Sequence, residues 1–243
     1  MNTSVAPAFH RATGYTFAGY PAGSKELASE IRGRVRQGDV FISASPRVDA
    51  TLRGKRNGNW VSWYAPFAST RLVLGYNRSS SFAAALRTRP WYQVITEPGF
   101  RLGFTDPALD PKGVLTVDAL DTAAKRYNEP ALSQIATDQN DVFPEEDLVG
   151  RLQSGQLDGA FFYTVEASAA RIPSVSLGPI DETATYTITA LNNAPNTAGG
   201  DAFVKFLLSS RGRLLLKRGG LAYVRPVAAG GGVPYLLNSV IKR

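Results

Sequence analysis

Asp110 is an acidic residue in a place that the sequence otherwise prepares for an anion. It lies in a turn-rich loop, residues 105–113, between an expected strand (residues 101–104) and an expected helix (residues 117–127). A strand that enters a helix through such a loop presents backbone N–H groups and the positive end of the helix dipole, which suit an anion. A carboxylate repels an anion at that point, so any function proposed for the loop must account for Asp110.

Neutral hydrogen-bond donors form a second group of candidate residues at the expected strand and helix ends. They are Ser24, Ser45, Ser69, Thr70, the backbone at Gly113 and the Tyr163 hydroxyl. Singly, each has a structural explanation: a serine such as Ser24 caps a helix, and a tyrosine such as Tyr163 packs in a core. Asp110 suits a turn, and Glu145 suits the first turn of a helix. Together, these residues at the strand and helix ends favour a bound small oxyanion.

The residues needed for common enzymes are missing from the sequence. His10 is the only histidine and there is no cysteine. A Ser-His-Asp triad would depend on His10, and no G-x-S-x-G elbow accompanies it. Zinc sites need more His or Cys ligands, and the glycines lack the spacing of a phosphate-binding loop or a dinucleotide fingerprint. The sequence therefore predicts a binding protein that is not an enzyme and has no cofactor.

Length and charge narrow the class of protein further. At 243 residues and 44% hydrophobic content, the chain can fill a sizeable core. No apolar run approaches the ~20 residues of a membrane span, so we expect a protein that is not embedded in a membrane. The net charge of +7 comes from scattered basic residues, which predicts a basic surface and disfavours nucleic acid as a partner.

Strands and helices alternate along the chain, which predicts an α/β fold. We expect strands at residues 15–18, 39–43, 70–76, 101–104, 157–163 and 186–191, and helices at 25–33, 47–53, 91–97, 117–127, from 144, 201–208 and 211–217. The two long strands, 70–76 and 186–191, bracket a middle block and would cross between two lobes. Residues 1–73 with 188–243 form the predicted lobe I, and residues 74–187 form lobe II, with ligand in the cleft.

Six blocks of the sequence resemble the periplasmic molybdate/tungstate-binding proteins of ABC importers, and most closely their archaeal-type branch. The blocks are GYTFAGYPAGSKELASEI, GDVFISASPRVDATL, GNWVSWYAPFASTRLVLGYN, TDPALDPKGVLTVDAL, FPEEDLVGRLQSGQLDGAFFY and YTITALNNAP. The resemblance implies a two-lobed type II periplasmic-binding-protein fold with mixed sheets flanked by helices and two crossing strands. It also implies a monomer, in the periplasm or at the cell surface, that delivers a small oxyanion to a membrane permease.

The resemblance also implies a role for the acidic residues. In the archaeal-type branch, two carboxylates complete a six-oxygen shell around the metal centre of the oxyanion, and the matching positions are Asp110 in LDPKG and Glu145 in PEEDLVG, beside Glu146. Sulfate and phosphate would only be repelled, whereas molybdenum(VI) and tungsten(VI) accept further hard oxygen donors. The implied hydrogen-bond donors are Ser24, Ser69, Gly113 and Tyr163, with Ser45 as a weaker candidate.

The start of the chain departs from this family pattern. Residues 1–9 lack the basic start and apolar core of a signal peptide, and residues 4–11 resemble the second half of a helix. We therefore expect the export signal, the first strand and its serine to be missing. Three alternatives stay open: a binder of sulfate, phosphate or an organic anion with the same fold, the effector-sensing domain of a transcription regulator, and a remnant that binds nothing.

Overall fold

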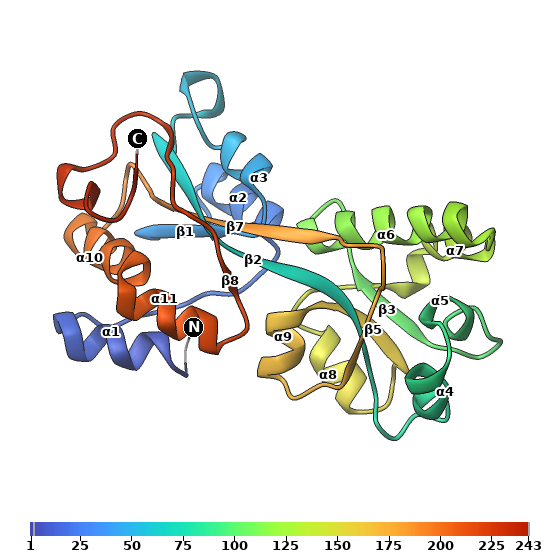
Figure 1. Ribbon diagram of the computed structural model, residues 1–243. Helices are drawn as coiled ribbons and strands as arrows, with labels where there is room; N and C mark the ends of the chain where they lie inside the picture. Colours follow the sequence, from blue (N-terminus) through green and yellow to red (C-terminus); the bar gives the residue numbers. More distant parts are fainter. Residues whose placement is uncertain (2, 243) are drawn as a thin grey trace. The chain divides into compact units, whose positions relative to one another are not determined.

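The computed structural model of this chain describes residue 1 and residues 3–242 and divides them into two compact units. Unit 1 comprises Met1–Ser69 and the chain from Thr185 onward, and unit 2 comprises Thr70–Ala184. The chain passes between the units inside two long strands, β2 (Trp63–Tyr76) and β7 (Thr183–Ala190) (Figure 1). Both boundaries lie a few residues before the predicted ones, 73/74 and 187/188.

Unit 1 combines a small sheet with helices from both ends of the chain. Its further elements are α1 (Val5–Thr13), α2 (Ser24–Arg32), β1 (Val40–Ser43), α3 (Pro46–Ala50), η1 (Lys55–Asn57), α10 (Thr197–Leu208), α11 (Ser210–Arg218), β8 (Ala222–Tyr223), β9 (Ala229–Gly230) and η3 (Tyr235–Leu237). Its strands follow the order β1-β7-β2. The β1–β7 pairing is antiparallel, with Val40 opposite Ala190, and the short strands β8 and β9 pair with β2.

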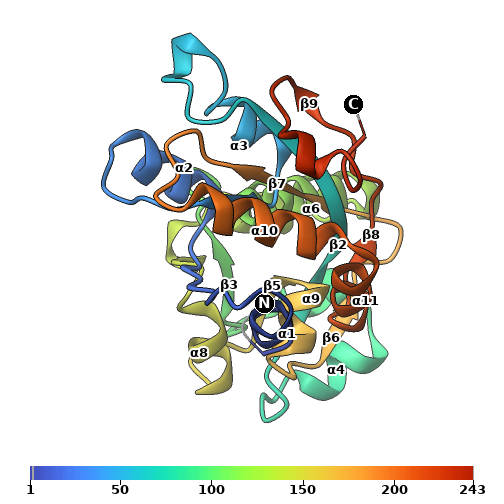
Figure 2. The same cartoon turned by 90° about the vertical axis from the view of Figure 1, so that its left-hand side faces the viewer.

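The core of unit 1 forms where α1 and α10 meet the strands. Phe9 of α1 makes an edge contact with Phe203 of α10, with 5.2 Å between the ring centroids. Ile188 of β7 is fully buried in the same cluster. In Figure 2, α10 lies in front of these strands and covers one face of them. A second buried cluster, which includes Ile31 and Phe41, fixes α2 and α3 against β1.

Unit 2 contains the uninterrupted middle of the chain. Its elements, besides parts of β2 and β7, are α4 (Ala83–Thr88), α5 (Trp91–Val94), β3 (Leu102–Thr105), α6 (Pro111–Tyr127), α7 (Ala131–Ile135), η2 (Gln139–Asp141), β4 (Val142–Phe143), α8 (Leu148–Gln153), β5 (Gly159–Tyr163), α9 (Thr164–Ala169) and β6 (Ser174–Ser176). The strand order is β2-β5-β3-β4. The β2–β5 pairing is antiparallel, whereas β5–β3 and β3–β4 are parallel. The predicted α/β class with mixed sheets and flanking helices is confirmed.

Helices cover unit 2 because its central strand is apolar on both faces. All five residues of β5, GAFFY, are buried. Phe162 packs in a cluster with Leu148 and Leu152 of α8. A strand with no polar face needs cover on both sides, which is typical of the inner strands of α/β sheets.

Two predicted elements were wrong at their N-terminal ends. The strand expected from residue 70 begins at Trp63, so Ser69 lies inside β2 rather than in a turn before it. The helix expected from residue 117 begins at Pro111, so Asp110 caps that helix rather than lying in a free loop. The fixed φ of proline suits the first helical position, and this allows α6 to start directly after Asp110.

Two other expected elements are not formed as predicted. Residues 15–18 are not a strand, and their side chains are mostly exposed. Pro144 does not begin a helix. It opens a turn in which the Asp147 N–H donates to the Pro144 carbonyl oxygen, and α8 starts at Leu148. Glu145 is therefore a turn residue ahead of the helix.

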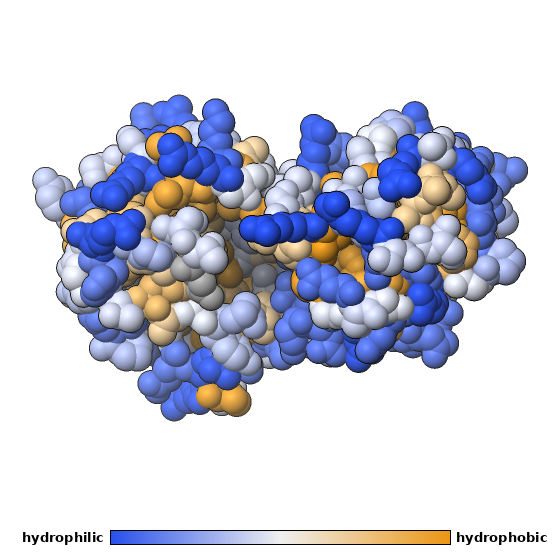
Figure 3. All heavy atoms as spheres, turned by 90° about the horizontal axis from the view of Figure 1, so that it is seen from below, coloured by the Kyte–Doolittle hydropathy of each residue, from blue (hydrophilic) through white to orange (hydrophobic). Residues whose placement is uncertain are grey.

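The surface is mostly hydrophilic on the face shown in Figure 3, with hydrophobic side chains interspersed. The most exposed large hydrophobic residues are Tyr235, at 90%, and Val35, at 75%. In the described part of the chain, no helix has both the length and the apolar character needed to cross a bilayer.

Candidate functional site

The N-terminus of α6 carries the Asp110 carboxylate. The Lys112 backbone N–H donates to Asp110 Oδ1 at 3.0 Å, and only 5% of Asp110 is exposed. This is the geometry of an N-cap, in which a side-chain oxygen satisfies a free N–H at the positive end of the helix. Burial raises the pKa of Asp110, although the Lys112 charge and N–H oppose that shift. The carboxylate is thus both held in place and partly desolvated.

Gly113 allows the first turn of α6 to lie directly against the loop after β3. A Cβ at this position would lie 2.2 Å from the Thr105 carbonyl oxygen and 2.6 Å from the Pro107 nitrogen. These are backbone atoms, which cannot rotate away from a new side chain. The position of the helix end relative to β3 therefore depends on glycine.

Lys112 places an ammonium in the interior of unit 2. Its side chain is 1% exposed, and Nζ donates to Glu166 Oε2 at 2.9 Å and to Glu145 Oε1 at 3.4 Å. Burial by itself would lower the pKa of Lys112, but the charges of Glu166, Glu145 and Asp110 outweigh burial and raise it. Because its pKa is raised, Lys112 keeps its charge. Lysines are buried almost only when they are paired, and here the carboxylates supply that pairing.

Glu145 approaches the same ammonium from the turn that precedes α8. Its side chain is 26% exposed, whereas the adjacent Glu146 is an exposed residue. Burial raises the pKa of Glu145, and the Lys112 charge opposes that shift. Of the two neighbouring acids in PEEDLVG, Glu145 is the one whose carboxylate contacts Lys112.

Tyr163 and Glu166 come from the junction between β5 and α9. Tyr163 is 2% exposed and occupies the N-cap position of α9. The Tyr163 backbone N–H donates to Glu166 Oε2 at 2.9 Å, so one carboxylate oxygen accepts from both Tyr163 and Lys112. Glu166 was not predicted as a site residue. An acid three residues after the end of a buried strand is a capping signal that could have indicated it.

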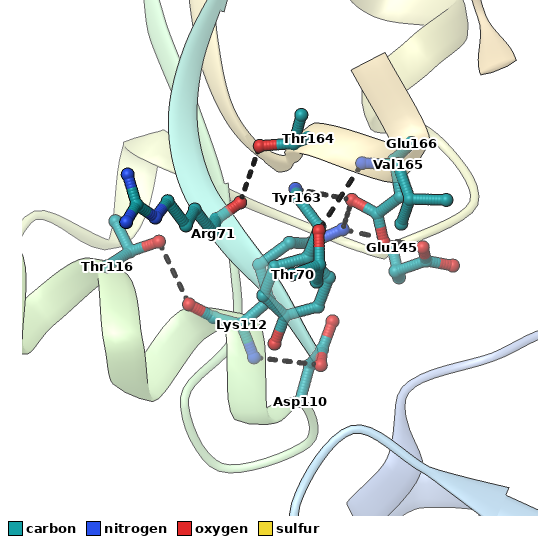
Figure 4. A network of polar contacts seen from close by, with 10 residues as sticks. All are labelled: Thr70, Arg71, Asp110, Lys112, Thr116, Glu145, Tyr163, Thr164, Val165 and Glu166. Carbon is teal, nitrogen blue, oxygen red and sulfur yellow. Dashed lines mark hydrogen bonds and ion pairs between the residues drawn. The ribbon is translucent and has the colours of Figure 1, made fainter. Parts of the chain in front are cut away.

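Unit 2 thus brings its predicted site residues together (Figure 4). Asp110, Glu145 and Tyr163 lie around Lys112, and Gly113 lies next to it in the same helical turn. Thr70 joins the same region, where its Oγ1 accepts from the Val165 N–H at 3.4 Å. Within the described part of the chain, no three His, Cys, Asp or Glu side chains are grouped so as to hold a metal ion.

The predicted serines belong to unit 1. Ser24 is the first residue of α2 and not its N-cap, which is Gly23. The Ser24 Oγ instead accepts a hydrogen bond from the Ala44 N–H at 3.1 Å. This bond connects α2 to the loop after β1. Ser45 follows in that loop, at the N-cap position of α3. Ser69 lies in β2, where it pairs with Ala222 of β8. Ser24 and Ser45 are therefore brought close together.

The family model of bacterial extracellular solute-binding proteins matches residues 1–222. The chain belongs to this family. Solute-binding proteins bind their ligands without transforming them, so the expectation that this chain is not an enzyme is confirmed. The family name also agrees with the expected location outside the cytoplasm.

Relatives of this solute-binding protein cover most of its length. A solute-binding protein of Petrotoga mobilis is 27% identical over 84% of this chain and 74% of its own length. The molybdate/tungstate-binding protein WtpA of Pyrococcus abyssi is 24% identical over 93% of this chain and 80% of its own length. The periplasmic molybdate-binding protein of Azotobacter vinelandii has the same fold, with a TM-score of 0.71 at 17% identity over 90% of this chain and 92% of that protein.

Proposed function

We propose that this protein is the solute-binding component of an ABC importer and that it binds molybdate or tungstate for delivery to a membrane permease. Family membership supports the transport role, and the similarity to a molybdate/tungstate-binding protein supports the choice of anion. A location in the periplasm or at the cell surface follows from this role.

The observation that carries the proposal is that Asp110 and Glu145 both bond to Lys112, Asp110 through the backbone N–H and Glu145 through the ammonium. Glu166 also bonds to the Lys112 ammonium, so the group has three carboxylates and one cation and is formally negative by two charges when all are ionised. Such a group repels a doubly charged anion whose central atom accepts no further ligands. Molybdenum(VI) and tungsten(VI) can accept carboxylate oxygens, so attraction at the metal centre offsets the repulsion.

The proposal assigns a role to each candidate residue. Asp110 and Glu145 are the two ligands of the metal centre. The α6 backbone at Gly113 and the Tyr163 hydroxyl, both in unit 2, donate to the oxyanion oxygens. Ser24, Ser45 and Ser69 of unit 1 stay candidate donors that the family resemblance implies. No resident cofactor is involved, because molybdate or tungstate is the transported ligand.

Calorimetric titration with tungstate, molybdate and sulfate tests the proposal. We expect tungstate and molybdate to bind and sulfate to bind at least about a hundredfold more weakly. Asp110→Asn keeps the helix cap but removes the anionic ligand, so it should weaken tungstate binding by more than about tenfold. Asp118→Asn, which changes an exposed residue of the same helix, is the matched control.

Two results would contradict the proposal. One is sulfate binding as tight as tungstate binding, which would favour a general anion binder of the same fold. The other is an Asp110→Asn variant with unchanged preference for tungstate over sulfate, since Asp110 would then not contact the metal centre.

A further inference from the structure

Lys112 bonds to both proposed ligand carboxylates. Its backbone N–H donates to Asp110 Oδ1, and its ammonium donates to Glu145 Oε1. These two acids come from different segments of the chain, the start of α6 and the turn before α8. A buried ammonium is costly unless its partners are well placed, so an apolar side chain would be the simpler choice for this interior position.

The two hydrogen bonds of the Lys112 ammonium differ in length and in how firmly the partner carboxylate is held. The bond to Glu166 is 2.9 Å and the bond to Glu145 is 3.4 Å. Glu166 is itself held by the Tyr163 N–H at the β5–α9 junction. Glu145 belongs to a turn and has the longer bond. The ammonium is therefore anchored by Glu166, and Glu145 is its more weakly bound partner.

The aromatic rings beside the ammonium strengthen this anchoring. The Lys112 nitrogen lies 5.6 Å from the centroid of the Tyr163 ring and 5.8 Å from that of Phe162. Both distances are within the range of cation–π attraction. Figure 4 shows Lys112 between Asp110, Tyr163 and the carboxylates of Glu145 and Glu166.

We propose that Lys112 is a positioning residue, which Glu166 anchors and which holds the Glu145 carboxylate where it can act together with Asp110. The ligand role of the two carboxylates rests on the proposed function. The claim that Lys112 holds Glu145 in place does not depend on it. Without the ammonium, the like charges of Asp110, Glu145 and Glu166 repel one another. Glu145, which is already partly exposed, would then turn toward water.

The first test uses the ligand-free protein and Lys112→Met, which keeps most of the side-chain volume but removes the charge. Amide hydrogen exchange of residues 143–147 should become faster by on the order of tenfold, because the turn loses its tie to Lys112. Lys125→Met, on the exposed surface of the same helix, should leave this exchange unchanged. Equal exchange in Lys112→Met and wild type would overturn the proposal. If Lys112→Met does not fold, Lys112→Gln is judged by the same criterion.

The second test is a double-mutant cycle on tungstate affinity. If Lys112 acts through Glu145, Lys112→Met should weaken binding by on the order of tenfold in the wild-type background and have little effect in the Glu145→Gln background. An equal loss in both backgrounds would show a general structural effect and overturn the positioning role. A wild-type protein that binds no tungstate would contradict the proposed function, and the exchange experiment would still decide whether Lys112 positions Glu145.

Discussion

A Cβ atom at Gly113 would lie 2.2 Å from the carbonyl oxygen of Thr105. This close approach sets where the N-terminus of α6 meets the end of β3. Because Asp110 and Lys112 lie within three residues of Gly113, the same contact determines where both of their side chains begin. Local packing and the candidate site are therefore coupled at this one glycine.

Gly113→Ala should destabilise the protein by about 3 kcal/mol, because the new methyl group overlaps backbone atoms that cannot move away. Urea denaturation would measure the change in the free energy of unfolding. Gly150→Ala is the matched control, since a Cβ at Gly150 in α8 meets no atom within 4 Å. That substitution should stabilise the protein by about 0.5–1 kcal/mol. A Gly113→Ala variant as stable as wild type would disprove the close approach.

Ser24→Ala should lower the stability of unit 1 whether or not Ser24 contacts a ligand. The Ser24 hydroxyl accepts from the Ala44 N–H, and its loss leaves that buried donor unsatisfied at a cost of about 1–3 kcal/mol. Ser29→Ala, at an exposed position of the same helix, should change stability by less than about 0.5 kcal/mol. The measurement is again urea denaturation, and equal effects of the two substitutions would argue against the Ser24 bond.

Asp49→Asn should change how stability depends on pH. Asp49 of α3 is fully buried, its Oδ2 accepts from the Thr187 hydroxyl, and burial raises its pKa to about 7. As pH rises from about 4 to 7, the unfolded chain loses this proton while the folded protein keeps it, so wild-type stability falls. Asparagine has no proton to lose. The variant should therefore gain roughly 2–4 kcal/mol relative to wild type between pH 4 and pH 8.

Denaturation of both proteins across that pH range measures the difference directly. All other titrating groups are shared, so they cancel when the two curves are compared. Parallel curves for wild type and Asp49→Asn would mean that the pKa of Asp49 is not raised in the folded protein.

The fold was predictable because its strong signals are local. Buried strands such as β5 combine apolar runs with turn residues at both ends, and such patterns depend only on neighbouring residues. Asp110 followed by Pro111 is also a local signal for the start of α6. The turn-forming residues around it led to the prediction of a loop instead. Pro144 followed by acidic residues also predicts a helix start, and that prediction was wrong. These residues form a turn instead.

The candidate site was only partly predictable because its central residue depends on contacts distant in sequence. Lysine is usually exposed, so nothing near Lys112 indicated burial. Its partners Glu145 and Glu166 lie 33 and 54 residues away. Asp110 and Glu145 could be named as candidates from the family resemblance, whereas the contacts of Lys112 and Glu166 required the three-dimensional structure.

The discontinuous composition of unit 1 has a consequence for the order in which the chain folds during synthesis. Unit 2 is one uninterrupted segment, so it has all of its residues once the ribosome has passed Ala184. Unit 1 cannot complete its core at that point, because Phe203, Val204 and Leu207 are still to be made. Domains generally fold as units as they emerge, so unit 2 should fold first. Phe9 and its apolar neighbours in the N-terminal segment therefore stay exposed until the last helices have been synthesised.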